Sequence, residues 1–376
     1  MEISISKIKY FFLIAPFLMS TIVFVLINGT FANLILMWKL VAFLYVAVQY
    51  LKRGKLSKFC AAVFLYFAVW FLSTLLNGQN IIEYCKEIIV MSFYIFLFEN
   101  AKWREETDTA VHITSLIIFL ELTVNLVCIW IFPNGLWHTT SMYGVETNYY
   151  FLGMDNQATP LIIIALFCVV YHYHNNMSRR YLYCYFVVVI LNTVLMGSAT
   201  CIAGFIVFVL FLLLSRVDSK IFNMRTAVLF VIVIYILFVL LRAQKLFEFF
   251  IVNVLQRDVG FSARTGIWDG AMRLVSEKPI LGYGCKTFAT LFKGRHAHNM
   301  YLQIMLQSGI VGFVLFLNYV RSVIKKCIHL EYATLCAATI LAYGICCMME
   351  VYNQGYLILL LSIYSVLEQR EDTFSQ

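Results

Sequence analysis

Charged residues are scarce in this sequence. Asp, Glu, Lys and Arg together make up 13% of its 376 residues, and 62% of the residues are hydrophobic, whereas soluble chains are about half apolar and a quarter charged. This composition excludes an ordinary soluble domain, since lipid is the solvent that accepts so much apolar surface. The apolar runs are long and do not alternate with polar residues, which favours helices over a closed barrel. We therefore predict an all-α, polytopic integral membrane protein.

The sequence lacks paired cysteine motifs, and it also lacks internal repeats and linkers. The eleven cysteines form no CxxC pair, and most of them, such as Cys60 and Cys168, lie in apolar runs where they act as small hydrophobes. Neither a disulfide framework nor a metal site is therefore predicted. The sequence also shows no internal repeat typical of the inverted halves of a transporter, and no low-complexity linker. We expect one integral membrane domain that covers residues 1–376.

Twelve apolar segments come close to the roughly 20 residues that a helix needs to cross a bilayer. The first follows Lys7 and Lys9 and is predicted to target the chain to the membrane without being cleaved. The predicted spans cover residues 10–27, 34–51, 59–76, 85–98, 111–132, 158–173, 181–196, 201–214, 227–241, 299–320, 332–349 and 355–367.

Lysine and arginine are concentrated in every second loop between these spans. Basic residues follow the second, fourth, sixth, eighth and tenth spans, and the intervening short loops carry almost none. Positive charge in short loops marks the cytoplasmic side. The pattern predicts that both termini are cytoplasmic and that the two long loops, residues 133–157 and 242–298, face outward. The net charge of +8 is thus a topology signal and no evidence of nucleic-acid binding.

The large outer loop, residues 242–298, is rich in basic and aromatic side chains. Two interpretations fit the cations: a solvated basic loop, or a site for anionic groups such as phosphate. The aromatic rings suit either the level of the lipid headgroups or stacking on sugar rings. The basic residues are Arg242, Lys245, Arg257, Arg264, Arg273, Lys278, Lys286, Lys293 and Arg295.

Within this loop, the stretch from Arg264 onward carries the densest polar signal. Its apolar residues, Trp268 among them, fall at helical spacing, and Pro279 ends the predicted helix. The LGYG string that follows predicts a tight turn. A histidine and an asparagine, His298 and Asn299, then open a long apolar helix. We interpret this stretch as the active segment.

Each candidate in the active segment has a catalytic and a structural interpretation. The His298 imidazole could take a proton from a sugar hydroxyl, or it is a boundary histidine without a role. His296 is less suited to act as the base, because it lies further from the span. Asn299 could orient the ring or a substrate hydroxyl, or cap the helix. Arg264 shares a helix face with Trp268, and it could clamp a diphosphate or form a cation–π contact with the indole.

Other polar positions also leave two interpretations open. Gly282 and Gly284 could let the backbone approach a ligand, or only form a turn. Asn156, within the string DNQA, could contact an acceptor sugar or cap the helix that begins there. Lys39 and Glu121 lie inside predicted spans, where charges usually face a cavity or a partner.

Residues of the active segment follow one pattern. They are Arg264, Trp268, Pro279, Leu281, Gly282, Gly284, His298, Asn299, Tyr301, Leu302, Gly309 and Gly312. This string resembles the signature of the O-antigen polymerase and ligase superfamily, bacterial polytopic enzymes that polymerise or transfer polysaccharide repeat units carried on undecaprenyl diphosphate. The family often carries Ser-Arg at the turn where Ser198 is followed by Ala199 here. Another cation would then have to face the diphosphate, with Lys39, Lys86 or Arg242 as candidates.

The resemblance implies how such a site would work. Arg264, with Arg273 or Lys286, would neutralise charge that develops on the diphosphate leaving group. His298 would activate or position the acceptor hydroxyl. The linkage to the diphosphate would supply the energy, so we predict no cofactor, no nucleotide and no metal. The remaining substrate-binding positions are expected to be Asn299, Trp268, Gly282, Gly284, Asn156 and Tyr301.

We therefore predict a repeat-unit polymerase for capsule, exopolysaccharide or O-antigen in the bacterial cytoplasmic membrane. Its expected partners are the undecaprenyl-diphosphate-linked oligosaccharide and membrane lipid, with a chain-length regulator as a further candidate and no nucleic acid. Two alternatives stay open. One is a ligase that passes finished glycan to a lipid or surface acceptor. The other is a transporter for such lipids, which would require paired discontinuous helices and polar residues at the membrane midplane.

Overall fold

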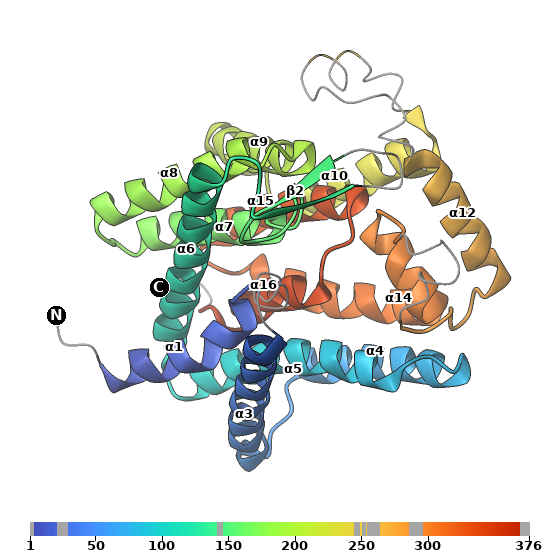
Figure 1. The fold of residues 1–376 in the computed structure, drawn as a ribbon, viewed down its shortest axis with the longest axis horizontal. Helices are drawn as coiled ribbons and strands as arrows, with labels where there is room; N and C mark the ends of the chain where they lie inside the picture. Colours follow the sequence, from blue (N-terminus) through green and yellow to red (C-terminus); the bar gives the residue numbers. More distant parts are fainter. Residues whose placement is uncertain are drawn as a thin grey trace, which may run out of the picture. The chain divides into compact units, whose positions relative to one another are not determined.

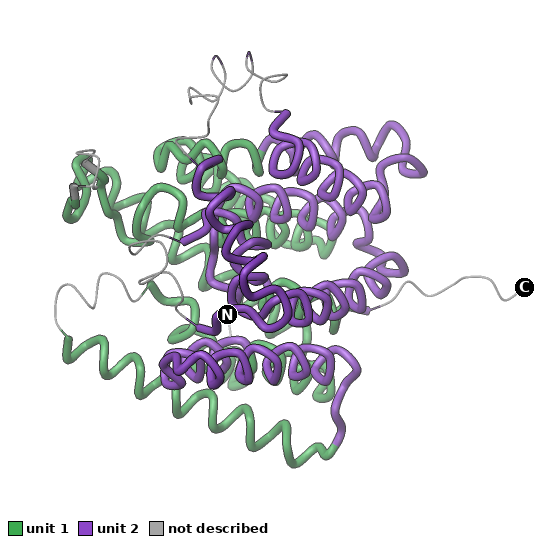
Figure 2. Tube along the Cα trace, turned by 90° about the vertical axis from the view of Figure 1, so that its right-hand side faces the viewer, with its two compact units in different colours: residues 1–54, 92–205, 358–367 green, residues 55–91, 206–357, 368–376 purple. Residues whose placement is uncertain are grey.

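The structure is a computed structural model that describes residues 4–20, 29–140, 146–243, 249, 253, 264–285 and 296–368. The chain divides into two compact units, coloured green and purple in Figure 2. Unit 1 comprises residues 1–54, 92–205 and 358–367. Unit 2 comprises residues 55–91, 206–357 and 368–376.

The described residues form thirteen α-helices, one π-helix and one two-stranded sheet (Figure 1). Unit 1 contains α1 (Ile5–Leu18), α3 (Gly29–Arg53), α6 (Thr107–Ile131), β1 (Trp137–Thr140), β2 (Glu146–Tyr149), α7 (Thr159–His174) and α8 (Arg179–Leu195). Unit 2 contains α4 (Lys58–Leu76), α10 (Met224–Tyr235), η1 (Ile236–Leu240), α12 (Arg264–Glu277), α14 (Met300–Cys327) and α15 (Ala333–Met349). Three helices have residues in both units: α5 (Ile81–Trp103), α9 (Ala199–Val217) and α16 (Gln354–Val366).

The predicted all-α membrane fold is confirmed. Each of the twelve predicted spans overlaps a helix, with α10 and η1 together forming the ninth. Five helices, α3, α4, α6, α9 and α14, are long and apolar enough to cross a membrane by length and composition. Residues 21–27 of the first predicted span lie outside the described ranges.

Several helix boundaries differ from the prediction, and the structure gives a reason for two of them. α1 begins at Ile5, because the hydroxyl of Ser4 accepts a hydrogen bond from the N–H of Lys7 and caps the helix. α14 continues to Cys327 instead of ending at residue 320, and Lys325 and Lys326 lie in its last turn. Cations near a helix C-terminus interact favourably with the helix dipole. These basic residues therefore extend the helix instead of forming a loop.

In unit 1, α6 packs against α1, α7 and α8. A buried amide network holds this packing: Asn125 Nδ2 donates to Asn192 Oδ1 at 2.9 Å, and Asn125 Oδ1 accepts from the backbone N–H of Leu152 at 2.8 Å. The Glu121 carboxylate, also on α6, accepts from the N–H of Ser20 at 3.1 Å. These polar groups inside apolar helices are thus used in packing within the unit.

Unit 1 also contains a β-hairpin that the sequence did not predict. β1 pairs antiparallel with β2. Trp137 lies opposite Tyr149, and their rings are stacked with centroids 5.2 Å apart. Aromatic cross-strand pairs of this kind stabilise two-stranded ribbons. The long loop between α6 and α7 is therefore partly ordered by strand pairing.

In unit 2, α14 packs against α4, α12 and α15, and α10 packs against α15. The predicted helix from Arg264 is confirmed as α12, which ends at Glu277 before Pro279. A buried cluster joins α12 to α14, with Trp268 and Leu302 among its members. Burial of these side chains fixes the amphipathic α12 against the start of α14.

α14 is broken at Gly309, whose φ of 64° is not helical. A break in an apolar helix frees backbone groups that need partners. The segment that starts at Pro279 and contains the LGYG turn supplies them. The N–H of Tyr283 donates to the carbonyl of Leu306 at 2.7 Å, and the N–H of Ile310 donates to the carbonyl of Pro279 at 2.7 Å. The turn is thus inserted into the break.

Three glycines permit this close approach. An added Cβ on Gly309 would lie 2.1 Å from the carbonyl oxygen of Ile280, and one on Gly282 would lie 2.4 Å from a carbonyl oxygen of α14. An added Cβ on Gly284 would lie 2.7 Å from the backbone of α4. All three glycines have positive φ. The structure therefore accounts for Gly282 and Gly284 by a turn packed against helix backbones.

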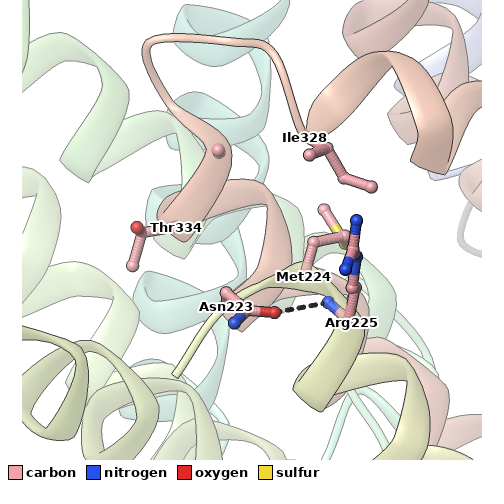
Figure 3. A pocket seen from close by; sticks show the side chains of 6 residues that line it. Asn223, Met224, Arg225, Ile328 and Thr334 are labelled. Atoms are coloured by element: carbon pink, nitrogen blue, oxygen red, sulfur yellow. Dashed lines mark hydrogen bonds between the residues drawn. The ribbon is translucent and has the colours of Figure 1, made fainter. Parts of the chain in front are cut away.

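Two loops that the charge pattern assigns to the cytoplasm lie together in unit 2. The residues at the start of α10 and the residues between α14 and α15 line a cavity of about 250 Å³ (Figure 3). This shared location agrees with the alternation of basic loops, which assigns both to one side. The lining residues are Asn223, Met224, Arg225, Ile328, Ala333 and Thr334.

We expect Gly309→Ala to destabilise the protein, because the new Cβ would collide with the inserted segment. The left-handed conformation alone costs an L residue about 1–2 kcal/mol, so the melting temperature of detergent-purified protein should fall by at least about 2–4 °C. Gly266→Ala is the matched control, since a Cβ there meets nothing within 4 Å and alanine favours the helix. An unchanged melting temperature for Gly309→Ala would contradict the close packing of the inserted turn against Gly309 in α14.

Thiol labelling of intact cells tests the predicted topology. Cys285 lies in the active segment but is only 4% exposed, so it is a poor reporter. We expect a cysteine introduced by Ser276→Cys, at an exposed position of α12, to react with a membrane-impermeant maleimide. The matched Ser219→Cys, in the exposed loop after α9, should react only after permeabilisation. The exposed Cys85 and Cys184 are first replaced by serine. The reverse labelling pattern would place the active segment on the cytoplasmic side.

Candidate active site

His298 and Asn299 lie where α14 begins. Asn299 is the N-cap residue, and its Oδ1 accepts from the N–H groups of Tyr301 at 3.0 Å and Leu302 at 3.1 Å. The structure thus assigns Asn299 to the cap. Its Nδ2 is buried and has no hydrogen-bond partner among the described residues, which leaves one unused donor in the active segment.

The backbone of His298 adopts an unusual conformation. Its φ of 46° lies in the left-handed region, which residues other than glycine rarely occupy. Two contacts hold it there: its carbonyl accepts from Nε1 of the buried Trp268 at 3.2 Å, and its N–H donates to Nδ1 of His296 at 3.3 Å. Strained backbone persists where its surroundings fix it, often at functional sites. Trp268 therefore positions His298 through the backbone.

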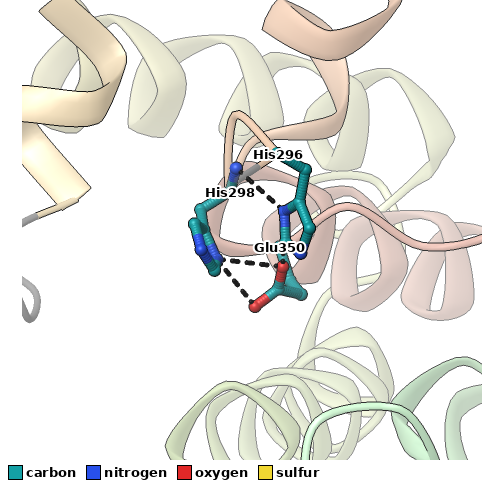
Figure 4. A group of neighbouring side chains, drawn as sticks. All are labelled: His296, His298 and Glu350. Carbon is teal, nitrogen blue, oxygen red and sulfur yellow. Dashed lines mark hydrogen bonds and ion pairs between the residues drawn. The ribbon is translucent and has the colours of Figure 1, made fainter. Parts of the chain in front are cut away.

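One carboxylate draws three basic side chains together. Glu350 directly follows α15 and is 3% exposed. Its Oε1 lies 3.1 Å from Nδ1 of His298 and 3.4 Å from Nδ1 of His296 (Figure 4). Its Oε2 lies 3.3 Å from Nη2 of Arg264. We call these four residues the carboxylate cluster; they come from α12, the segment before α14, and the end of α15.

The charges of the carboxylate cluster shift the pKa values of its members. Burial alone would raise the pKa of Glu350, but the hydrogen bond from His298, the charge of Arg264 and the charge that His298 and His296 carry when protonated outweigh it, so this pKa lies below its usual value. Burial lowers the pKa of His296; the charges of His298 and Arg264 add to this effect and Glu350 opposes it. At neutral pH the cluster therefore holds an ionised carboxylate beside a neutral His296.

The hydrogen bond to Glu350 determines which nitrogen of His298 carries the proton. A carboxylate only accepts hydrogen bonds, so the contact requires a proton on Nδ1. In a neutral ring Nε2 is then unprotonated and able to accept a proton. The side chain is 28% exposed, so the ring is open to solvent. The arrangement is that of a general base oriented by a carboxylate.

The cation that the structure places over the Trp268 ring is Arg242. Its guanidinium carbon lies 5.1 Å from the ring centre. Its Nη2 pairs with the Asp269 carboxylate and donates to the carbonyl of Thr265 at 3.2 Å. Arg242 thus binds α12, the helix that carries Arg264. Two guanidinium groups are therefore anchored on this helix, one of them within the carboxylate cluster.

Four other predicted site residues make structural contacts within unit 2. Arg273 is 80% exposed and pairs with Glu277 at 3.6 Å on the surface of α12. Tyr301 donates its hydroxyl to a backbone carbonyl of α15 at 3.1 Å. Gly282 and Gly284 form the inserted turn. Binding of substrate by these residues stays a prediction.

The last two predicted site residues are Lys286 and Asn156. Lys286 falls outside the described residues. Asn156 belongs to unit 1, before α7. The predicted helix cap does not form there: the N-cap residue is Ala158, which makes no side-chain cap, and Asp155 Oδ1 instead accepts from the N–H of Asn156 at 2.8 Å. A local turn therefore replaces the cap.

Sequence reasoning missed Glu350. It lies 52 residues after His298, so no spacing rule links the two. One signal was present, because Glu350 is the one charged residue between Glu331 and Glu368. A carboxylate isolated in such an apolar stretch usually has a partner or a function.

These features define a class: a multi-pass, all-α membrane protein with a polar site where a helix begins. A family model described as O-Antigen ligase matches residues 182–317, which include α12 and the start of α14. This match supports the resemblance of the chain to the O-antigen ligase and polymerase superfamily. Glu350 lies beyond the matched residues.

One relative is a protein of Rickettsia conorii that bears the name "Putative polysaccharide ligase". It is 34% identical to this chain over 84 residues, which cover 18% of this chain and 20% of that protein. The chain thus matches about a fifth of the relative's length.

We expect Glu350→Ala to destabilise the protein more than a matched surface change. The variant would leave His298 and Arg264 without their buried carboxylate, at a cost of about 1–3 kcal/mol. Glu277→Ala is the control, because that carboxylate is 52% exposed and its pair with Arg273 contributes at most about 1 kcal/mol. Thermal unfolding in detergent compares the two variants. Equal melting temperatures would contradict the carboxylate cluster.

Proposed function

We propose that the protein is a polysaccharide repeat-unit polymerase. It transfers a growing glycan from undecaprenyl diphosphate to a sugar hydroxyl of another lipid-linked repeat unit, at the outer face of the bacterial cytoplasmic membrane. The observation that carries the proposal is the contact between His298 Nδ1 and the buried Glu350 at 3.1 Å, because it holds an imidazole in the form of a general base. The match of residues 182–317 to the O-antigen ligase family model supports the class of substrate.

His298 acts on the acceptor hydroxyl. Its Nε2 takes the hydroxyl proton while the oxygen attacks the anomeric carbon of the donor glycan. The glycosidic C–O bond forms, and the bond between that carbon and the diphosphate oxygen breaks. Glu350 keeps the ring oriented and stabilises the imidazolium that results.

Arg264 acts on the leaving group. The diphosphate gains negative charge as the bond to the glycan breaks, and preorganised cations contribute strongly to such a step. A guanidinium has five N–H donors, and the contact with Glu350 at 3.3 Å engages one nitrogen, so other donors remain for phosphate oxygens. Arg242, which binds the same helix, takes the place of the arginine that the family often carries where Ala199 stands here. The linkage supplies the free energy, so the transfer requires no nucleotide, metal or other cofactor.

A ligase is the second candidate, and the comparisons fit it as well. The matching family model carries the description O-Antigen ligase, and the name of the Rickettsia relative refers to polysaccharide ligation. The roles of His298 and Arg264 would be unchanged. The acceptor would then be a lipid or another surface molecule, and the donor would carry a finished glycan.

We expect His298→Ala to stop transfer while the protein remains in the membrane. Loss of a general base should lower the rate by about 10²–10⁴-fold. The measurement is elongation of lipid-linked repeat units by purified protein, without added metal or nucleotide. His329→Ala is the control, since His329 is an exposed histidine of the same unit. Full-length polymer made by the His298→Ala protein at the normal rate would refute the role of the base.

A gel of the surface glycan from a strain that lacks the protein separates the two candidates. Loss of a polymerase leaves single repeat units, whereas loss of a ligase leaves long chains that are not attached to an acceptor. An unchanged glycan pattern would contradict both.

A further inference from the structure

We propose that His296, His298 and Glu350 form a binding site for a divalent transition metal ion, with Zn²⁺ as the best fit, and that its occupancy inhibits glycan transfer. One ligand atom from each residue lies within 4.8 Å of the other two (Figure 4). The three residues come from two segments of unit 2 that the fold brings together.

The spacing of these atoms fits a tetrahedral coordination sphere. Zn²⁺ binds imidazole nitrogen and carboxylate oxygen at about 2.0–2.2 Å, so two ligand atoms of one tetrahedron are about 3.3–3.6 Å apart. Glu350 Oε1 is 3.1 Å from Nδ1 of His298 and 3.4 Å from Nδ1 of His296. Small side-chain movements would therefore bring all three atoms to one ion.

The hydrogen bonds keep His296 Nδ1 in the unprotonated form that binds metal ions, and an ion would replace the N–H of His298 as the partner of its lone pair. Nδ1 of His296 accepts from the backbone N–H of His298 at 3.3 Å, so this nitrogen carries a lone pair and no proton. The same nitrogen lies 3.4 Å from a carboxylate oxygen of Glu350. Two acceptors thus approach each other without a proton between them. A cation bound to both would replace this repulsion by attraction.

The ligand types select among metal ions. Two imidazoles and one carboxylate form a known ligand set of Zn²⁺, with a fourth position for water, whereas Mg²⁺ and Ca²⁺ prefer oxygen ligands. The ion would reach the site from solvent, since the side chains of His296 and His298 are 43% and 28% exposed. Oε1 of Glu350 lies near both histidines, whereas Oε2 contacts Arg264 and is also 3.2 Å from Nδ1 of His298.

Inhibition follows from the tautomer of His298, and this step rests on the proposed function. With the ion on Nδ1, the single proton of the neutral ring moves to Nε2. Nε2 then donates a hydrogen bond instead of accepting a proton, so it no longer activates the acceptor hydroxyl. Removal of the ion by a chelator should restore transfer.

The test measures binding separately from activity. Isothermal titration calorimetry with ZnCl₂ is performed on full-length protein that was dialysed against a chelator and purified through a tag without histidine. We expect His296→Ala to raise the Kd for Zn²⁺ by about tenfold or more. His296 also accepts from the N–H of His298, so transfer with zinc is compared with transfer without zinc for each variant separately. In His296→Ala, half-maximal inhibition should require a higher zinc concentration than in the unchanged protein. His329→Ala should behave as the unchanged protein, and Mg²⁺ should not compete.

Each outcome decides one part of the proposal. Equal zinc binding by the unchanged protein and by His296→Ala would overturn the site. If the alanine variant does not fold, His296→Gln replaces it, because glutamine preserves more of the side-chain volume. Zinc binding that depends on His296 without inhibition would overturn the inhibitory role. A protein with no transfer activity would refute the proposed function, while the calorimetry would still decide whether the metal site exists.

Discussion

Unit 2 depends on how a broken apolar helix satisfies its backbone. An unpaired backbone group in an apolar surrounding costs several kcal/mol. The break at Gly309 would leave such groups, and the turn after α12 supplies their partners. Two contacts consequently hold α12 against α14. One is this turn, and the other is Trp268, whose indole N–H donates to the carbonyl of His298. The position of His298 is therefore a consequence of a hydrogen-bond requirement deep in the helix pair.

The carboxylate cluster follows a second constraint, the cost of a buried charge. Glu350 is buried in a chain with few charges, and a buried carboxylate is tolerated where cations and hydrogen bonds compensate it. His298, His296 and Arg264 share this one anion. A proton or a metal ion on Nδ1 gives His298 opposite properties at Nε2, so the occupant of that nitrogen decides whether the ring is a base. A bound diphosphate would in turn compete with Glu350 for Arg264.

Local patterns predicted the elements, but they did not predict where distant elements meet. Hydropathy gave the spans, helical spacing gave α12, and paired glycines gave the LGYG turn, because each of these signals lies within a few neighbouring residues. The role of Glu350 escaped because its partners are more than 50 residues away in sequence. Gly309 gave no sign of a break, since a single glycine also fits an uninterrupted helix. Asn299 stayed ambiguous because helix caps and ligand-binding amides use the same residue type.

The break in α14 also distinguishes the enzyme from the transporter interpretation. Transporters use discontinuous helices whose freed backbone groups coordinate the substrate near the membrane midplane. In α14 the carbonyl of Leu306 and the N–H of Ile310 are instead bonded to the backbone of the inserted turn. They are therefore not available to a passing substrate. The polar groups that remain for a ligand include His298, just before the start of α14, and Arg264, on α12. The candidate polar groups are concentrated at one end of α14, and the backbone groups at its break are already paired. This arrangement favours a reaction at the membrane boundary over passage of a substrate through the membrane midplane.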